Sequence, residues 1–290
     1  AEKTPLVLQA EVCTSVFRYL DAAAMVCVSL SCKHYAEILS KDDEWKAWLA
    51  MLCDMPAQPP FHPPLTLRQL ALKVGSALMQ RPEMLAANVI GASSVDQDVE
   101  DASNVLKWSE CAPDVRQGGA HQSMTEEGRK EMRSRCRCDP AVGARYRPCY
   151  WSSLPTDDAA SNEWIWIKLR GVACLVSEVS VYPYEAYWQP RDNETGTCPI
   201  YSPQALQWEF GHFGEVPEGG EGDVWAATDR VNVPHGAEGK RVRLERPLLV
   251  LGGEARVRLL GRVQRQTFES MGEYYTCVQH LSVAGWSLQG

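Results

Sequence analysis

The sequence predicts an α+β multidomain protein, with a small helical unit followed by an antiparallel β-sandwich. Over residues 11–53 the apolar residues recur with helical spacing, three to four positions apart. From about residue 84 the spacing changes to two, and glycine and proline clusters separate the alternating segments. We therefore expect helices over 1–55, a proline spacer with a linker helix over 56–83, and a sandwich over 84–290.

Composition narrows the class of protein. The chain has 290 residues, of which 45% are hydrophobic and 23% charged, as in ordinary globular domains. No window approaches the ~18 uninterrupted apolar residues of a membrane helix, and the start shows no secretory signal. Eleven cysteines without a framework spacing then favour reduced thiols in the cytoplasm or nucleus. A net charge of −8 argues against nonspecific nucleic-acid binding.

The first segment carries apolar residues on several helical faces. Asp42 or Asp43 provides an N-cap for the helix that contains Trp45 and Trp48. A segment of this size buries too little surface to be stable alone, so it should dock on the sandwich or on another protein. The proline run CDMPAQPPFHPP favours another protein, because a spacer would hold the helices away from the sandwich.

A further helix follows the prolines. Thr66 and Gln69 form a predicted capping box, and Leu65 and Leu70 a predicted hydrophobic staple. The apolar face of this helix continues until Pro82 ends it.

The remaining segments alternate. The predicted strands are EWIWIKL, SEVSVYP, ALQWEF, EARVRLLGRV and YYTCVQHLSVAG. Glycine-rich and proline-rich turns lie between them, and no convincing helix does, which favours a sandwich over a βαβ sheet. Eight of the ten tryptophans follow residue 100, and such large side chains suit a core between two sheets.

The helical segment also resembles a known motif. The stretch LQAEVCTSVFRYLDAAAMVCVSLSCKHYAEILSKDDEWK is similar to an F-box, the three-helix motif that docks on Skp1 in cullin-based ubiquitin ligases. Gln9, Ala24 and Tyr35 depart from the usual motif residues but keep the apolar pattern. The resemblance implies a set of Skp1-contacting residues: Leu8, Val12, Val16, Leu20, Met25, Val28, Cys32 and Trp45.

The rest of the chain carries a second resemblance. The blocks CYWSS, VSEVSVYPYEAYWQP, PIYSPQALQWEFGH, LLGRVQRQ and YYTCVQHLSVAG are similar to plant and algal F-box proteins with a C-terminal β domain. That domain resembles the galactose-binding or discoidin-type jelly roll. The two resemblances together imply a non-catalytic adaptor, whose F-box holds the ligase and whose β domain presents a target.

No residue pattern indicates catalysis. Asp157 and Asp158 lie in a polar loop, where turn chemistry explains them better than acid–base catalysis. The CRCDP stretch with Cys149 and His121 could form a zinc site, but it lacks the paired C-x₂₋₄-C hooks of structural zinc sites. No nucleophile constellation or phosphate-binding loop is recognisable. We expect no catalytic residue, metal or cofactor.

Basic residues suggest a contact with an acidic target. Arg256 and Arg258 lie two apart on a predicted strand, as do Arg241 and Arg243, so each pair would share one outward face. Our hypothesis is a positive stripe that receives an acidic or phosphorylated segment. The basic run RKEMRSRCRCDPAVGARYRP is either a further contact of this kind or a solvated connection.

Aromatic residues suggest a second contact. The loop VYPYEAYWQP brings together Tyr184, Glu185, Tyr187 and Trp188, which could bind a sugar or a peptide or could plug the end of the core. The segment GRVQRQ, with Arg262 and Arg265, poses the same alternatives. Trp151 completes the candidate target-binding residues.

Two classes of function therefore compete. The first is a substrate adaptor of a Skp1–cullin ligase, in which the sandwich binds a protein or glycoprotein target. The second is a structural component, in which the F-box and Skp1 are built into a stable assembly and nothing is degraded. Binding of a glycan by the sandwich is compatible with either class.

Overall fold

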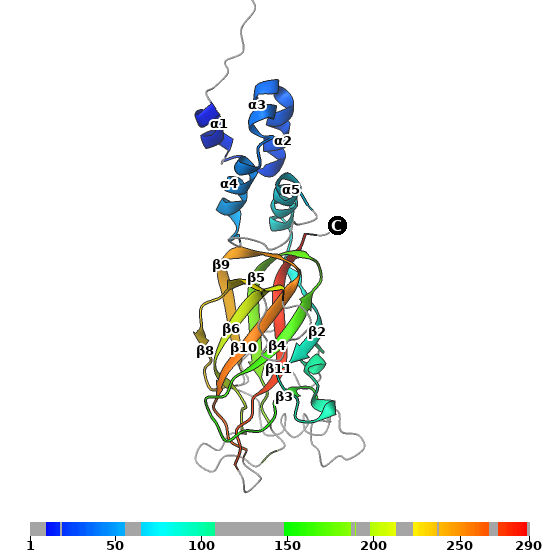
Figure 1. Ribbon diagram of the computed structural model, residues 1–290, viewed down its shortest axis with the longest axis vertical. Helices are drawn as coiled ribbons and strands as arrows, with labels where there is room; N and C mark the ends of the chain where they lie inside the picture. The colour runs from blue at the N-terminus through cyan, green and yellow to red at the C-terminus, as the bar shows by residue number, and fades with distance from the viewer. Residues whose placement is uncertain are drawn as a thin grey trace, which may run out of the picture.

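The computed structural model of the chain describes residues 10–17, 19–55, 65–107, 148–186, 189, 198–212, 223–236, 238–266 and 272–288. Figure 1 shows five α-helices gathered at one end of an elongated molecule and the strands at the other. The helices are α1 (Ala10–Phe17), α2 (Ala22–Ser31), α3 (Lys33–Ile38), α4 (Asp42–Leu52) and α5 (Leu67–Leu78). None of the described helices has the length and apolar character needed to cross a membrane.

Two sheets form the second part of the molecule. The strands are β1 (Glu83–Met84), β2 (Ala86–Ala92), β3 (Trp151–Ser152), β4 (Glu163–Leu169), β5 (Ala173–Pro183), β6 (Pro203–His212), β7 (Asp223–Ala227), β8 (Val231–Asn232), β9 (Lys240–Leu251), β10 (Glu254–Arg262) and β11 (Cys277–Ser287). The order is β1-β11-β5-β9 in the first sheet, called sheet A, with β3 paired to β11. In sheet B it is β2-β4-β10-β6-β7, with β8 paired to β6. All pairings between these strands are antiparallel, which confirms the predicted antiparallel sandwich.

The alternating pattern fills the space between the two sheets. In β4, Ile165 and Ile167 are fully buried, whereas Trp164 and Lys168 are only half-buried on the outer face. Trp208 of β6 faces the same core. Each fully buried aliphatic side chain of this kind contributes about 1.5–3 kcal/mol to folding. The same core contains Val179, Val181, Phe210, Val257, Leu259, Leu281 and Val283.

One glycine pair lets the chain cross from sheet A to sheet B. Gly252 and Gly253 connect β9 to β10 with φ angles of 101° and 66°. Side chains disfavour these angles, and a Cβ on Gly253 would lie 2.4 Å from the carbonyl oxygen of Gly171. The tight crossover therefore requires glycine.

Two short 3₁₀ helices interrupt the β region, which the sequence predicted to lack helices. They are η1 (Asp98–Glu100) and η2 (Ala102–Leu106). Asn104 of η2 donates from its side-chain nitrogen to the carbonyl oxygens of Val99 and Tyr150, at 2.9 and 3.1 Å. Both turns are too short for an apolar periodicity to show them.

The helix starts largely follow the predicted capping. Thr66 and Gln69 form the predicted capping box at the start of α5. Helix α4 begins at Asp42, so Lys41 is its N-cap instead of the predicted Asp42 or Asp43. Both aspartates lie in the first turn instead, where the helix dipole favours negative charge.

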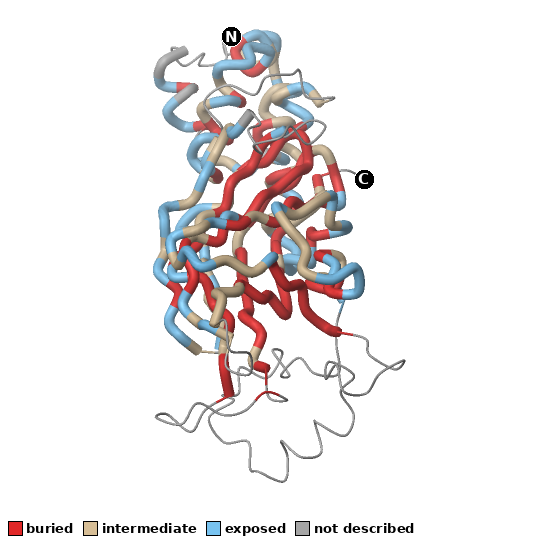
Figure 2. The backbone as a smooth tube through the Cα atoms, turned by 60° about the horizontal axis from the view of Figure 1, so that its bottom comes forward, coloured by how far each residue is buried: buried red, intermediate tan, exposed pale blue. Residues whose placement is uncertain are grey.

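The helices pack directly on the sandwich. A shared group of buried residues, called the junction core, contains Trp48 and Leu49 of α4, Leu70 and Val74 of α5, Leu175 of β5, and Leu249 and Leu251 of β9. Figure 2 shows the buried backbone continuing from the sandwich into the helical end. The interpretation that the spacer region holds the helices away from the sandwich is therefore wrong, because α5 is part of the contact.

Polar contacts fix the same junction. The Arg246 guanidinium donates to the carbonyl oxygens of Ala50 and Cys53 at the C-terminal end of α4, and it pairs with Asp54 at 3.4 Å. The backbone of Asp54 adds to the edge of β9: its N–H donates to Pro247 O at 2.8 Å, and its carbonyl accepts from the N–H of Leu249 at 2.8 Å. The last turn of α4 is thus held by β9.

Candidate functional site

Helix α1 exposes two apolar side chains on one side. Val12 and Val16 lie four residues apart, share a face of α1, and are each 45% exposed. Cys13 and Phe17, on the other side, are buried among the helices. Helix α1 therefore has an inner apolar face that is covered and an outer one that is not.

Two larger apolar side chains are exposed nearby in the sequence. Tyr19, in the turn after α1, is 91% exposed, and Leu30, near the end of α2, is 79% exposed. Val12 and Val16 are called the exposed apolar face, and Tyr19 and Leu30 are further exposed apolar side chains of the helical unit. Exposed apolar side chains grouped on one small unit indicate an interaction surface.

The structure divides the residues predicted to contact Skp1. Val12 and Val16 are exposed, and the structure leaves Leu20, Val28 and Cys32 half-buried. Met25 and Trp45 are each 1% exposed in the helical interior, where the Trp45 indole donates to Leu39 O at 2.8 Å. These two residues hold the helices together and present no surface to a partner, which corrects that part of the prediction. Leu8 lies outside the described residues.

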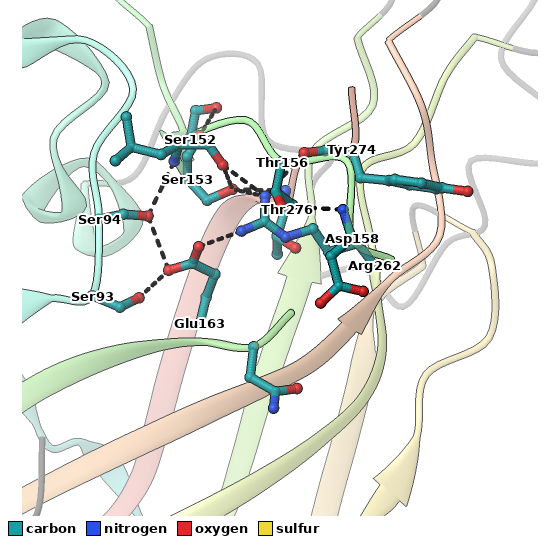
Figure 3. A network of polar contacts seen from close by, with 12 residues as sticks. Ser93, Ser94, Ser152, Ser153, Thr156, Asp158, Glu163, Arg262, Tyr274 and Thr276 are labelled. Carbon is teal, nitrogen blue, oxygen red and sulfur yellow. Dashed lines mark hydrogen bonds and ion pairs between the residues drawn. The ribbon is translucent and has the colours of Figure 1, made fainter. Parts of the chain in front are cut away.

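At the other end of the sandwich, Arg262 is the centre of a polar network (Figure 3). Its guanidinium donates to Ser153 Oγ at 2.9 Å and to the carbonyl oxygens of Leu154 and Tyr274 at 2.7 and 3.0 Å. A second nitrogen pairs with the Glu163 carboxylate at the start of β4. The network therefore joins the end of β10 to the start of β4 and to two loops.

Glu163 extends the network to a third segment. Its carboxylate accepts from the hydroxyls of Ser93 and Ser94, which follow β2. Ser153 Oγ in turn accepts from the N–H of Thr276 at 3.0 Å, next to β11. Strands of both sheets are thus linked at this end of the sandwich.

The network is interior. Arg262 is 3% exposed and Glu163 is 6% exposed. Burial lowers the pKa of the Arg262 guanidinium, an effect that the neighbouring Glu163 charge opposes. Arg262 thus positions the loops and does not face a target, which corrects the prediction that it contacts one.

The aromatic candidates at this end are also largely interior. Tyr184 is 1% exposed and stacks on Tyr150 with ring centroids 3.9 Å apart. Trp151 is fully buried, and its indole donates to Ser94 O at 2.9 Å. Both side chains are part of the core, so the interpretation of the rings as a plug holds for Tyr184, and Trp151 is not a contact residue.

The other members of the predicted aromatic loop differ. Glu185 is half-buried and its backbone pairs with Ile200. Tyr187 and Trp188 lie outside the described residues. Arg265, beyond β10, is exposed, and its guanidinium lies over the Tyr274 ring, 4.5 Å from the centroid.

The predicted positive stripe on β10 is largely neutralised. Arg256 and Arg258 do share the outer face of sheet B, but both pair with Glu209 of β6. Two nitrogens of Arg256 lie 2.7 Å from one Glu209 oxygen, whereas Arg258 lies 3.5 Å from the other. Arg256 is buried and not part of an outward stripe, which corrects the prediction, and Arg258 remains exposed.

The described cysteines have little nucleophilic character where they are deeply buried. Burial raises the pKa of the Cys53 thiol to about 11 and that of Cys174 to about 12, and it raises the pKa of Cys277 further. Only thiolates attack or bind metals efficiently. Within the described ranges no group of three or more histidine, cysteine, aspartate or glutamate side chains could hold a metal ion.

Sequence reasoning missed the acidic partners of the arginines. Glu209 continues an alternating run at an outward position next to Trp208, whereas Glu163 begins a run at an inward position, on the same side as Ile165 and Ile167. A carboxylate at an outward position, with arginines at outward positions of another strand, is the signal that could have indicated the Glu209 pairs, and a carboxylate at an inward position is the signal that could have indicated a buried partner for Glu163. Strand order is needed to use it, because these partners are 99 and 47 residues apart in sequence.

Comparison with known proteins supports the first resemblance. The chain is 32% identical over 158 residues to F-box protein At4g00755 of Arabidopsis thaliana, in an alignment that covers 49% of this chain and 40% of the relative. The similarity predicted from the helical and strand segments is thereby confirmed, over less than half of the relative. No family model matches the chain.

Similar solved structures include carbohydrate-binding modules. One is chitosan-binding module 1 of a chitosanase/glucanase from Paenibacillus sp. IK-5, with a TM-score of 0.39 and 13% identity over 70% of this chain and 99% of the module. Another is CBM32-3 of a family 31 glycoside hydrolase from Clostridium perfringens, with a TM-score of 0.34 and 13% identity over 69% of this chain and 90% of the module. Similarity at this level assigns no ligand to this chain.

Proposed function

We propose that the chain is a non-catalytic adaptor, whose exposed apolar face docks on a Skp1-like subunit and whose sandwich binds a protein or glycan target. The single observation that carries the proposal is the exposure of Val12 and Val16 on a helix whose adjacent residues Cys13 and Phe17 are buried. The similarity to an F-box protein of Arabidopsis thaliana supports the choice of partner.

The two functions would use opposite ends of the molecule. Helix α1 lies at the end remote from the Arg262 network, with the sandwich between them (Figure 1). The junction core and Arg246 connect these two parts. A target bound at the sandwich would then be held near a ubiquitin-conjugating enzyme of a cullin complex, and the resulting effective concentration would drive transfer without a catalytic residue in this chain.

The division into 1–55, 56–83 and 84–290 belongs to this proposal with one change. Helix α5 packs with α4 in the junction core, so the segment 56–83 contributes to the docking unit. The compartment we propose is the cytoplasm or nucleus, because the eleven cysteines of the chain show no disulfide-framework spacing.

The docking surface can be tested with the double substitution Val12→Glu and Val16→Glu. Burying two carboxylates in an apolar interface is strongly unfavourable, so we expect the affinity for a Skp1-like protein to fall by more than about 100-fold. The affinity would be measured by titration calorimetry with purified proteins.

The matched control is Val99→Glu with Val263→Glu. These valines are similarly exposed but lie on η1 and just after β10, away from the helices. We expect the control to bind as well as the unchanged chain. Full binding by the Val12/Val16 variant, or an equal loss in the control, would exclude the exposed apolar face as the docking surface.

The second class of function, a structural F-box component without a degradative role, uses the same apolar face. The composition of the purified complex separates the two. A cullin and short-lived partners in the purified material would support the ligase adaptor. Recovery of one stable particle with fixed stoichiometry would support the structural component.

A further inference from the structure

The outer face of sheet B carries a row of three side chains with complementary chemistry. Trp164 of β4 lies directly opposite Arg258 of β10, and Arg258 lies directly opposite Gln207 of β6. Neighbouring strands are ~4.8 Å apart, so the row extends over roughly 10 Å. We call these three residues the Trp164 row.

Arg258 is the guanidinium in this region that remains available. Glu209 makes two 2.7 Å contacts with Arg256, and Arg258 keeps a looser contact of 3.5 Å with the same carboxylate. The two arginines and one glutamate therefore leave one net positive charge, located at the exposed Arg258. Gln207 is held in place by a 3.1 Å hydrogen bond from its side-chain nitrogen to Thr228 O.

We propose that the Trp164 row binds an acidic oligosaccharide. The half-buried indole offers an apolar face to a sugar ring, and Arg258 offers its planar donors to a sugar carboxylate. Gln207, one strand further, can hydrogen-bond hydroxyl groups of the next sugar unit. The inference rests on the proposed target-binding role of the sandwich and gives that target a chemical class and a place.

An extended peptide fits this surface less well. Peptides that bind to sheets add a strand to a free edge, where backbone groups are unpaired. Here β4, β10 and β6 each have a paired strand on both sides, so their backbone groups are used within the sheet. Only side chains are offered, and a saccharide needs only side chains.

The test uses the purified full chain and three probes in titration calorimetry. The first probe is a trimer of galacturonic acid, the second is the methyl ester of the same trimer, which has a similar shape without the charge, and the third is triglutamate peptide. We expect the acidic trimer to bind with Kd below about 1 mM. We expect the ester and the peptide to bind at least about tenfold more weakly.

Variants connect the binding to the row. Arg258→Gln should weaken binding of the acidic trimer at least about tenfold. The control Arg243→Gln changes an exposed arginine in the same Arg-x-Arg pattern on the other sheet, and it should have no effect. Arg258→Gln is suited to this test, because an exposed side chain can be changed without disturbing the core.

Three results would overturn the inference: no binding of the acidic trimer, equal weakening by Arg258→Gln and Arg243→Gln, or equal binding of triglutamate. None of these affects the docking measurement with the Val12/Val16 variant, which uses the other end of the molecule. The adaptor proposal and the saccharide proposal can therefore fail separately.

Discussion

Two Arg-x-Arg pairs in this molecule share one local pattern and differ in their surroundings. Arg256 and Arg258 of β10 pair with Glu209, and their side chains are 9%, 45% and 8% exposed, respectively. Arg241 and Arg243 of β9 pair with Glu178 of β5, and these three side chains are 54%, 82% and 18% exposed. The same three-residue arrangement thus has a buried arginine and a buried carboxylate on one sheet and is largely solvated on the other.

Strand order explains the difference. β10 has β4 on one side and β6 on the other, so Arg256 lies between Trp166 and Glu209. β9 is the last strand of sheet A, and only β5 flanks its arginines. Charges on an edge strand protect it from pairing with other chains. An arginine pair on a strand therefore indicates a binding surface only when the residues on the adjacent strands are known.

The largest effect should come from removing the carboxylate of the interior group. Glu209→Gln removes the carboxylate that lies 2.7 Å from two nitrogens of the buried Arg256, and breaking a buried ion pair typically costs about 3–5 kcal/mol. We expect the free energy of unfolding in urea to fall by that amount. A loss below about 1 kcal/mol would mean that water or another acid compensates, and that the two groups do not differ as described.

A buried histidine tests whether the burial of an outward polar side chain depends more on the position of its strand within the sheet than on which sheet it belongs to. His280 lies on the outer face of sheet A, but β11 has neighbours on both sides, and the residue is 5% exposed. Burial lowers its pKa below the ordinary 6.5, an effect partly opposed by the hydrogen bond to Val105 O. The neutral ring is therefore favoured in the folded state.

The sign of the pH effect follows. Above pH 6.5 the stabilisation from the neutral ring is fully present, and it is lost as the pH falls through 6.5 toward the lower folded pKa, because the unfolded chain takes up the proton first. Urea unfolding between pH 7.5 and 5 should show decreasing stability. His280→Gln should flatten this decrease, and an unchanged pH profile in that variant would contradict the assignment.

A smaller effect is expected at the solvated group. Glu178→Gln removes a carboxylate shared by two exposed arginines, and pairs of this kind contribute about 0–1 kcal/mol. Urea unfolding at low ionic strength should show a loss within that range, and the loss should shrink in 0.5 M salt. A loss as large as that of Glu209→Gln would remove the distinction between the two groups.

The smallest effect should follow Arg243→Gln, because this side chain is the most exposed of the six. We expect no change in unfolding free energy beyond about 0.5 kcal/mol. The same variant serves as the control for saccharide binding, so one protein supplies both measurements. A clear destabilisation would show that Arg243 makes a stronger interaction than its solvated contact with Glu178.

Local patterns in the sequence were sufficient to predict most of the elements. Alternation correctly located β4, β5, β6, β10 and β11, and the Thr66–Gln69 capping box correctly located the start of α5. Both signals involve residues within a few positions of one another. The packing of the helices on the sandwich was one of two predicted alternatives and the less favoured one, because its contacts are remote in sequence: Arg246 and the C-terminal end of α4 are about 190 residues apart.

The candidate site was harder to predict for the same reason. Alternation correctly put Arg256 and Arg258 on one face of β10, but the burial of Arg256 depends on Glu209 and on the order β4-β10-β6. For Tyr184 and Trp151, the sequence pattern is the same whether the side chain fills the core or binds a ligand. Only the folded arrangement, with Tyr184 stacked on Tyr150, separates the two.

The junction core affects how the chain can be dissected in the laboratory. Deleting the first 55 residues would remove α4 from its contacts with Leu175, Leu249 and Leu251 and would expose these apolar side chains at the end of the sandwich. Such a fragment should aggregate or bind chaperones. The proteins that co-purify with it would then reflect the newly exposed apolar surface and not the loss of a docking partner. Substitutions on α1 leave the junction core intact and are therefore a more specific way to test the proposed docking.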